Sequence, residues 1–504
     1  MSSSEMSRRA MLRAGGALAA GAAFTVLPKV AFADAAPGST RTQTATGTFP
    51  PGIPDWYYLP VQVPAGVSQI DVSYSYDRPT VPAGVRGNAC DIGMFGPEGY
   101  ELGNQRGFRG WSGGFRTQFS ISASDATPGY VPGPITPGTW HVILGPYTVA
   151  PQGLNYQVQI TLTFGPQGAA FQPNPAPASA PARQRGRSWY RGDCHLHTVH
   201  SDGRRTPDQL VADARAAGLD FIVSTEHNTD SASLQWGAHA TDDLLILNGE
   251  EVTTRSGHWP AIGLPPAAWI DWRYRANGPS RFRQFVDQVH RLGGLVTAAH
   301  PFAACFGCTF EFTYELADLV EVWNGPWTAD DQQTVDHWDG LLRSGRRIPA
   351  IGDSDAHNPG QIVGLPHTVV LADGLRREDL LAGLKAGRSW LAESAAVELD
   401  FTASSADGRS TGIGSRLTAD TGTAVTAQVT VSGVPGTTVA ILDQLGVEAS
   451  ADVPDSGQAT LSWTTYPRYS RYLRAEVRRA SGGINTTVPN AMVAMTNPIY
   501  IGED

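Results

Sequence analysis

The sequence predicts a multidomain protein that combines an α/β barrel with flanking all-β domains. Its 504 residues exceed the roughly 250 to 300 residues at which a single core stops growing. Both ends carry alternating apolar and polar runs punctuated by Gly and Pro, whereas the middle third alternates short apolar runs with helical segments. The first pattern is typical of β-sandwiches, and the second is typical of parallel sheets.

The N-terminal all-β domain is predicted over residues 36–170. Runs such as 156–162 alternate apolar and polar side chains between Gly- and Pro-rich turns, which indicates a sandwich-like fold. Residues 171–188 are rich in Pro and Ala and then basic, as in a linker. A second sandwich-like domain is expected over 395–504, where residues 424–431 alternate in the same way.

We interpret residues 189–394 as the barrel domain. Thr206 and Pro207 indicate a helix start, because Thr caps a helix well and Pro suits its first position. Seven apolar runs predict strands, a number that suits a barrel, and they centre on Cys194, Ile222, Ile246, Val296, Val320, Ile351 and Val369.

Residues 1–35 are predicted to be a twin-arginine signal peptide. Arg8 and Arg9 precede a stretch of Ala, Gly and Leu, and A-x-A cleavage patterns follow it. A transmembrane anchor is the weaker alternative, because Pro28 and Lys29 interrupt the apolar stretch. We therefore expect an exported protein, secreted or held in the periplasm or cell envelope, with no transmembrane anchor after cleavage.

Composition limits the class of partner and the use of cysteine. With 37 Lys and Arg against 47 Asp and Glu, the chain lacks the basic footprint of a nucleic-acid binder, so a small-molecule or lipid-like ester substrate is expected. Cys305 and Cys308 form a single C-x-x-C pair, which in an exported protein favours a small disulfide over a zinc or redox site. Cys194 is interpreted as a buried core thiol.

Histidine is concentrated where the strands of the barrel are predicted to end. Eleven of the 12 histidines lie between His195 and His367. Because side chains alternate along a strand, His195 and His197 should project from the same face, and Asp202 follows on the next loop. Parallel barrels build active sites at the C-terminal ends of their strands, so these side chains are candidate metal ligands.

Further ligand-type side chains follow the other predicted strands. They are His227, Glu251, His258, His300, Asp355 and His357. Imidazole mixed with carboxylate suits zinc, manganese or iron rather than calcium or magnesium, and it does not choose among the three. One such histidine is more often structural than a ligand, but burying this many ionisable groups without a metal would cost much free energy.

The segment from Asp193 to His357 resembles the PHP (polymerase and histidinol phosphatase) superfamily. Residues Gly249–Thr254, Val322–Gly325 and Gly352–His357 are similar to motifs of its CehA/McbA-type metallohydrolase branch. The resemblance implies a distorted seven-stranded, TIM-like βα barrel that holds two or three divalent transition metal ions.

The resemblance also implies a set of ligands. One metal ion would take His195, His197, Glu251 and Asp355; a second would share Glu251 and add His258 and His300; a third would use Asp202, His227 and His357. Glu251 is preferred over Glu250, which is interpreted as a solvated carboxylate or one lying behind the ligands. Asp193 and Asp353 are expected to support ligands rather than to bind metal.

Metal ions about 3.5 to 4 Å apart can share a water molecule, lower its pKa and stabilise a developing oxyanion, so no Ser or Cys nucleophile is required. The expected catalytic residues are Glu251, Asp355 and His357. The candidates for contact with substrate are Arg255, Asn228 and His367, of which His367 is expected in a loop near the last strand of the barrel.

The leading functional hypothesis is a phosphoesterase or phosphodiesterase. A carboxylic or carbamate ester hydrolase is the alternative, because the same activated water attacks either kind of centre. From a different class, the chain could be a metal-stabilised protein that binds a glycan or cell-wall polymer. The nearly complete set of ligands argues against that, since an inactive barrel would be expected to have lost some of them.

Overall fold

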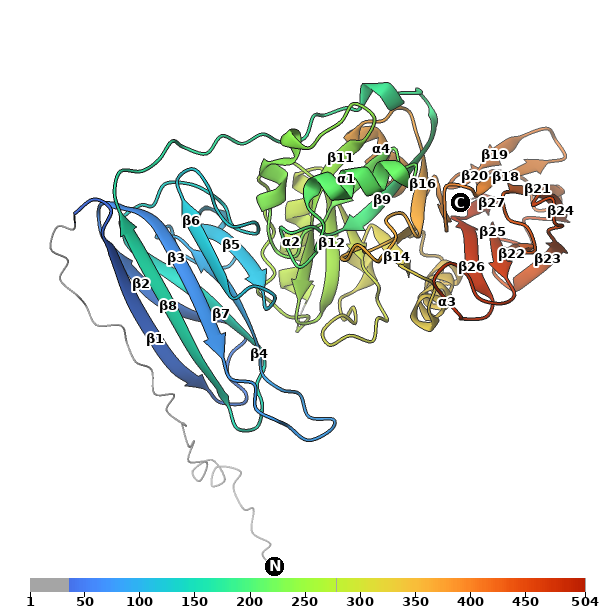
Figure 1. The fold of residues 1–504 in the computed structure, drawn as a ribbon. Coiled ribbons are helices and arrows are strands. Elements are labelled where there is room, and N and C mark those ends of the chain that lie inside the picture. Colours follow the sequence, from blue (N-terminus) through green and yellow to red (C-terminus); the bar gives the residue numbers. More distant parts are fainter. Residues whose placement is uncertain (1–35, 278, 504) are drawn as a thin grey trace, which may run out of the picture.

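The computed structural model describes residues 36–277 and 279–503 (Figure 1), so the predicted signal peptide lies outside the described residues. Its N-terminal part consists of two four-stranded antiparallel sheets, ordered β1-β8-β3-β6 and β2-β7-β4-β5. The strands are β1 (Thr40–Phe49), β2 (Tyr57–Val63), β3 (Val67–Tyr76), β4 (Ala89–Phe95), β5 (Phe108–Gly113), β6 (Gln118–Ser122), β7 (Gly138–Thr148) and β8 (Leu154–Phe164).

The two N-terminal sheets pack face to face because their strands alternate buried and accessible side chains. Every second residue of β8 is buried. Val158 and Ile160 of β8 share one hydrophobic core with Val61 of β2 and Leu144 of β7. The predicted alternation therefore produces a sandwich with its core between the sheets.

The middle of the chain forms part of a 15-stranded sheet whose order starts β15-β14-β13-β12-β11-β10-β9-β16-β17. Its strands are β9 (Ser188–Leu196), β10 (Phe221–Ser224), β11 (Leu245–Thr254), β12 (Gly257–Leu264), β13 (Leu295–Ala298), β14 (Leu319–Asn324), β15 (Ala350–Asp353), β16 (His367–Ala372) and β17 (Ser389–Ala392). Strands β9 to β11 are parallel, as are β13 to β15, whereas β12 is antiparallel to both of its neighbours.

Four α-helices connect these strands: α1 (Pro207–Ala216), α2 (Pro279–Arg291), α3 (Ala329–Arg343) and α4 (Arg377–Lys385). Helix α1 starts as predicted, with Thr206 accepting a hydrogen bond from the Gln209 N–H in a capping box. Short 3-10 turns are formed by Gln105–Gly107, Pro181–Arg183, Ser231–Leu234, Trp236–Ala238 and Tyr314–Leu316. None of the helices in the described part of the chain is long and apolar enough to cross a membrane.

The barrel is the part of the predicted fold that the strand pairing does not confirm. All seven predicted apolar runs lie in strands, but the run at Val369 forms β16, which is antiparallel to β9. Strand β12, which forms a hairpin with β11, was not among the predicted strands. Among the described residues, a single bridge between Leu196 and Ala356 joins the β9 side of the sheet to the loop after β15, so no closed barrel is formed by strand ladders.

The C-terminal strands continue the central sheet, because β17 pairs with β26. A separate sheet, ordered β19-β18-β21-β24, packs beside them. These strands are β18 (Glu398–Ser405), β19 (Ser410–Gly412), β20 (Arg416–Leu417), β21 (Val425–Ser432), β22 (Thr438–Asp443), β23 (Gly446–Asp452), β24 (Ala459–Thr465), β25 (Tyr472–Arg479), β26 (Ala491–Thr496) and β27 (Ile499–Ile501). The sheet thus crosses the predicted division at residue 394, and the domain limits stay predictions.

An aromatic interface joins the N-terminal sandwich to the central sheet. The rings of Phe108 and Trp269 stack with their centres 4.2 Å apart, and those of Trp111 and Trp272 lie 4.6 Å apart. Gly129 of the sandwich donates its N–H to the hydroxyl oxygen of Ser231. The sandwich is therefore packed against the half of the molecule that carries the candidate ligands.

Candidate metal centre

The predicted metal ligands converge at one edge of the central sheet. His195 and His197 stand at the end of β9, and Asp202 lies in the loop that follows it. Glu251 lies in β11, His258 lies in β12, and the others follow the ends of β10, β13 and β15. The C-terminal ends of parallel strands meet at one edge, so residues far apart in sequence come together there. The structure brings all the predicted ligands into overlapping clusters of His, Asp and Glu.

Glu251 lies at the centre of this arrangement. Its Oε2 is 3.2 Å from His195 Nε2, 3.4 Å from His197 Nε2 and 2.9 Å from His227 Nδ1. Its Oε1 is 2.9 Å from His258 Nδ1 and 3.3 Å from His300 Nε2. One carboxylate therefore faces histidines from several strands, as a ligand that bridges two ions would.

Asp355 provides a second point of contact. Its Oδ1 lies 3.0 Å from His197 Nε2, 3.4 Å from His195 Nε2 and 3.5 Å from His357 Nδ1. Its φ angle is 47°, in the left-handed region that residues other than glycine seldom adopt. His300 (26°) and Asn228 (56°) share this region, so backbone strain is concentrated around the cluster.

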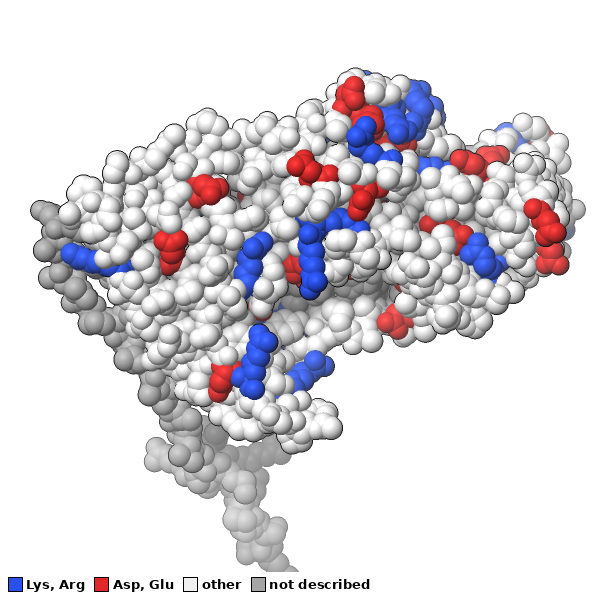
Figure 2. All heavy atoms as spheres, in the orientation of Figure 1, with Lys and Arg blue, Asp and Glu red and all other residues white. Residues whose placement is uncertain are grey.

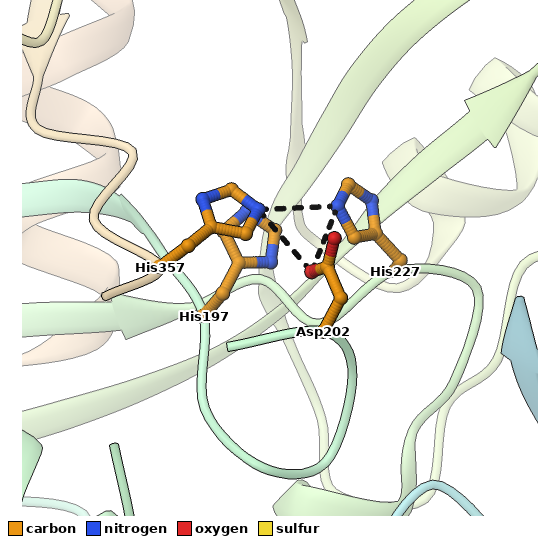
Figure 3. Close-up of side chains that lie close together, drawn as sticks. All are labelled: His197, Asp202, His227 and His357. Carbon is orange, nitrogen blue, oxygen red and sulfur yellow. Dashed lines mark hydrogen bonds and ion pairs between the residues drawn. The ribbon is translucent and has the colours of Figure 1, made fainter. Parts of the chain in front are cut away.

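The outer part of the cluster is shown in Figure 3, where His197, Asp202, His227 and His357 point toward one another. Asp202 Oδ1 lies 3.2 Å from His357 Nε2 and 3.4 Å from His227 Nε2. The two Nε2 atoms of His227 and His357 are 3.4 Å apart. These residues match the third ligand group that the resemblance implied, with His197 added to it.

The groupings differ from the implied ones in two further ways. His300 lies within ligand distance of His195 and Asp355 as well as of Glu251 and His258. His195 and His197 share a cluster with Glu251, but no single cluster contains all four residues expected around the first ion. The described side chains thus form one continuous set of donors rather than three separate sites.

Several ligand-type atoms are buried without a hydrogen bond. Among the described residues, His195 Nε2, His197 Nε2, Glu251 Oε2 and Asp355 Oδ1 have no hydrogen-bond partner, although each is shielded from solvent. Unpaired buried polar atoms are costly and uncommon. Because these atoms face one another within 3.4 Å or less, they fit transition metal ions bound between them.

Further buried side chains orient the ligands from behind. Glu321 Oε1 lies 2.9 Å from His195 Nδ1, and its Oε2 accepts the His300 N–H at 2.8 Å. Ser201 Oγ lies 3.3 Å from His197 Nδ1 and donates to Glu226. Bonds to Nδ1 leave Nε2 turned toward the cluster.

Sequence reasoning missed Glu321 and Glu226 as functional residues. Glu321 interrupts an apolar strand, between Val320 and Val322 of β14, and it is buried. A lone carboxylate in a strand that is otherwise apolar was the available signal, because a charge in such a place needs a partner.

The electrostatics favour ionised carboxylates at Glu251 and Asp355, whereas the candidate histidine ligands are divided between lowered and raised pKa values. Burial, together with the charges of the neighbouring His357 and His227, lowers the pKa of His197 to about 3. Burial opposes ionisation of Asp355, but His195 and His357 outweigh it and hold the carboxyl pKa well below its usual range. Glu251 behaves in the same way, with His227 and His195 as the dominant opposing charges to burial, so its pKa is also well below its usual range. Metal ions bind neutral imidazole and ionised carboxylate. Against the effect of burial, the facing carboxylates raise the pKa of His195, His227, His300 and His357, so these imidazoles would release a proton when a metal ion binds.

The supporting residues lie where they were expected, except for Glu250. Asp193 accepts hydrogen bonds from the Ser354 hydroxyl and from the Gly364 N–H, and Asp353 accepts the Cys194 N–H at 2.7 Å. Cys194 is buried in the hydrophobic core. Glu250 is fully buried and accepts the Ile270 N–H at 2.8 Å, so the interpretation of it as a solvated carboxylate is wrong.

Two of the three candidate substrate contacts lie beside a cavity. Asn228 and Arg255 line a cavity of about 300 Å3 next to Asp202, His227 and His258. Cys305 and Cys308 form a disulfide, and Cys308 borders the same cavity.

His367 does not lie in a loop beside this cavity. It begins β16 and is fully buried, with Nδ1 2.9 Å from the carbonyl oxygen of Gly364 and Nε2 2.9 Å from Arg191 Nη1. The expectation that it lies in a loop is wrong, because the strand that follows begins earlier than the sequence suggested. Its place in the strand ladder gives it a structural role.

A short segment of the chain is similar to a known family. Residues 343–389 match the family model described as PHP-associated, and this segment contains the candidate ligands Asp355 and His357. The match confirms the resemblance at the level of the PHP superfamily, while the CehA/McbA-type branch stays a prediction. None of the curated proteins matches the chain.

Similar solved structures share little sequence with this chain. A two-domain protein from Bacteroides vulgatus that contains a predicted PHP-like metal-dependent phosphoesterase is 16% identical, covers 66% of this chain and 100% of its own, and has a TM-score of 0.35. An amidohydrolase from Chromobacterium violaceum with bound sulfate and no metal is 20% identical, with 34% and 89% coverage and a TM-score of 0.25. A chain from Bifidobacterium adolescentis assigned as a metal-dependent phosphoesterase is 18% identical, with 42% and 96% coverage and a TM-score of 0.26.

Proposed function

We propose that this chain is an exported, metal-dependent hydrolase of phosphoesters. The main support for this proposal is a set of buried donor atoms that have no hydrogen-bond partner and face one another beside a cavity. They belong to His195, His197, Glu251 and Asp355. A glycan-binding protein would need the cavity but not this set of donors. A hydrolase that binds two or three transition metal ions needs both.

The cluster is open to solvent on one side only. The side chains of Asp202, His227 and His357 are 40%, 20% and 21% exposed, whereas those of His195, His197 and Glu251 are 1% exposed or less. Substrate therefore approaches past the partly exposed residues, which also border the cavity through Asp202 and His227.

The roles of the residues follow from this geometry. Divalent ions held here would polarise the ester and lower the pKa of a water molecule. Glu251 and Asp355 fix the imidazoles around them as ionised carboxylates. His357 lies 2.8 Å from the backbone oxygen of Asp355 through Nδ1, which turns its Nε2 toward Asp202 and His227. There it would help to hold a third ion; with only two ions bound, it could instead hold or release a proton during ester cleavage.

The test is metal content together with turnover. The full chain should contain transition metal by elemental analysis and hydrolyse bis-p-nitrophenyl phosphate. The His195→Ala, Asp355→Ala double variant should lose bound metal and at least about a hundredfold in kcat/KM. His290→Ala is a matched control. His290 lies on α2, outside the ligand clusters, and pairs with Asp318. A fully active preparation free of transition metal would end the proposal.

Carboxylic or carbamate esters are the second candidate class of substrate. The specific observation is that the cavity has more apolar than polar wall, with Trp56, Trp111, Tyr147 and Trp272 among its lining residues. Naphthyl acetate and a naphthyl carbamate should therefore be assayed beside the phosphodiester. Turnover of these esters alone would replace the phosphoesterase assignment and keep the hydrolase.

We also propose export by the twin-arginine route and a small-molecule or lipid-like partner. Support for export is the sequence of residues 1–35, and the mass of the mature chain from the extracytoplasmic fraction tests it. Support for a small partner is the size of the cavity, and Figure 2 shows acidic and basic side chains interspersed over one face of the molecule.

A further inference from the structure

The cavity beside the metal ligands is walled mainly by residues from outside the ligand cluster. Trp56, Asp91, Trp111 and Tyr147 come from the N-terminal sandwich, and Arg255 comes from the β11–β12 hairpin. The volume of about 300 Å3 is at the lower end of the range for small-molecule sites. Flat rings on several sides favour a flat apolar group as the occupant.

Arg255 is the unusual member of this wall. Its side chain is 5% exposed, and its guanidinium carbon lies 4.0 Å from the ring centre of Tyr147 and 5.0 Å from that of Trp56. Within the described residues, its Nε and Nη2 atoms have no hydrogen-bond partner. The carboxylate of Asp91 stands 3.7 Å from Nη2, beyond hydrogen-bond distance.

Two buried N–H donors without an acceptor indicate a missing ligand oxygen. A guanidinium presents its donors in a planar fork that fits an oxyanion such as a carboxylate. Burial lowers the pKa of Arg255, although Asp91 and Tyr147 oppose this, so an incoming anion would relieve the desolvation of the cation.

The position of Arg255 separates it from the metal-binding atoms. Glu251 and Thr253 lie on one face of β11, where Thr253 pairs with His258. Arg255 follows in the turn of the hairpin, where it lines the cavity together with Thr253. Each step of two residues advances roughly 6 to 7 Å along a strand. Because the guanidinium is also held against rings of the sandwich, it should meet a part of the substrate remote from the scissile bond.

We propose that this cavity is a substrate subsite, built with the N-terminal sandwich, that binds a flat apolar substituent of the ester while Arg255 binds an oxyanion at the remote end of that substituent. The substrate class is thus a small aromatic ester that carries a remote acidic group. That the bound molecule is a substrate rests on the proposed hydrolase function. Its binding to the cavity can be measured without turnover.

The first experiment measures binding of benzoate and of benzamide to the metal-loaded full chain by calorimetry. The two probes share a ring and differ in the oxyanion. Benzoate should bind at least about tenfold more tightly, as expected for a charge-assisted contact to Arg255. Arg255→Gln should remove this preference, and Arg255→Lys should keep part of it. Asp91→Asn removes the competing carboxylate and should tighten benzoate binding.

The Asp91→Asn variant keeps the test decisive if Arg255→Gln does not fold. Benzoate held by the metal ions instead of by Arg255 would bind equally to native protein, Arg255→Lys and Asp91→Asn. That result, or equal affinity for benzoate and benzamide in the native protein, would overturn the subsite.

The second experiment compares turnover of phenyl p-nitrophenyl phosphate and 4-carboxyphenyl p-nitrophenyl phosphate. The carboxylated probe should have a kcat/KM about tenfold higher in native protein, and the ratio should fall toward one in Arg255→Gln. Equal turnover of both probes by native protein refutes the subsite and leaves the hydrolase intact. Benzoate preference without turnover of either probe refutes the phosphoesterase and leaves the subsite intact.

Discussion

Two adjacent glutamates show how the environment of a residue decides its role. Glu251 faces the ligand histidines, and their charges hold its carboxyl pKa well below the usual range against the effect of burial. Glu250 points to the other side of β11, where burial raises its pKa well above the usual range. The histidines thus favour the ionised form of the first carboxyl and burial favours the neutral form of the second, although the two residues are neighbours in sequence.

Substitution by glutamine should therefore separate the two residues. Glu251→Gln removes the charge shared by the ligand histidines, so bound metal should fall by at least one equivalent and kcat/KM by about a hundredfold or more. Glu250→Gln replaces a carboxyl whose neutral form is favoured by burial with a neutral amide of similar shape. This variant should retain both the bound metal and kcat/KM. Elemental analysis and steady-state kinetics measure the difference, and equal losses in the two variants would contradict the bridging role of Glu251.

His367 should affect stability rather than substrate binding. Burial and the nearby Arg191 lower its pKa to about 4, whereas in the unfolded chain the value is about 6.5. Between these values the unfolded state binds a proton that the folded state does not, so the free energy of unfolding falls as pH drops from about 6.5 to 4.

The expected slope is up to about 1.4 kcal/mol per pH unit from this one group. His367→Gln should reduce the pH dependence of denaturant unfolding by that amount in the same window. An unchanged slope in the variant would show that His367 is not held neutral in the folded protein.

At the scale of an element, the β11–β12 hairpin is the main support of the site, because it carries Glu251, Arg255 and His258. Its turn depends on Gly257, which has a φ angle of 111°. A Cβ atom there would lie 2.6 Å from Cα of Phe310. Both the backbone conformation and this close approach require glycine.

Gly257→Ala should lower the midpoint of thermal unfolding and weaken metal retention, with a loss in stability above roughly 1 kcal/mol. Gly340→Ala is the matched control. Gly340 lies inside α3, and a Cβ there meets nothing within 4 Å, so this change should stabilise the protein by about 0.5 to 1 kcal/mol. Calorimetric scans of both variants give the comparison, and a shift of the same sign in both would refute the argument.

At the scale of the whole molecule, a buried ion pair joins the sandwich to the central sheet. The side chains of Arg273 and Asp271 are 2% and 0% exposed and lie 2.6 Å apart. Arg273 also donates to the Tyr58 hydroxyl, and Asp271 accepts the Gly103 N–H. The pair thus connects the N-terminal sandwich to the segment between β12 and α2.

Replacing one residue of this pair should lower the free energy of unfolding more than replacing both. Arg273→Met leaves the Asp271 carboxylate buried without its cation, which typically costs about 3 to 5 kcal/mol. The double variant with Asp271→Asn should recover part of that loss. Thermal unfolding of native, single and double variants measures the ordering, and a double variant less stable than Arg273→Met would contradict it.

The sequence by itself determined the strand patterns and the list of candidate ligands. Alternation over 156–162 predicted β8, and the residues His195, His197, Glu251 and Asp355 were identifiable because imidazoles and carboxylates at strand ends are chemically conspicuous. Local pattern carries this information, since strand period and residue chemistry depend on near neighbours in the chain.

Only the tertiary structure decided which groups meet. It placed Glu321 behind His195, buried His367 in β16 beside Arg191, and set Arg255 against Tyr147 and Trp56 of the sandwich. It also showed β12 antiparallel to its neighbours and left the strand ladder without closure among the described residues. Such contacts join segments far apart in sequence, and their free energy comes from packing and desolvation that no local pattern records.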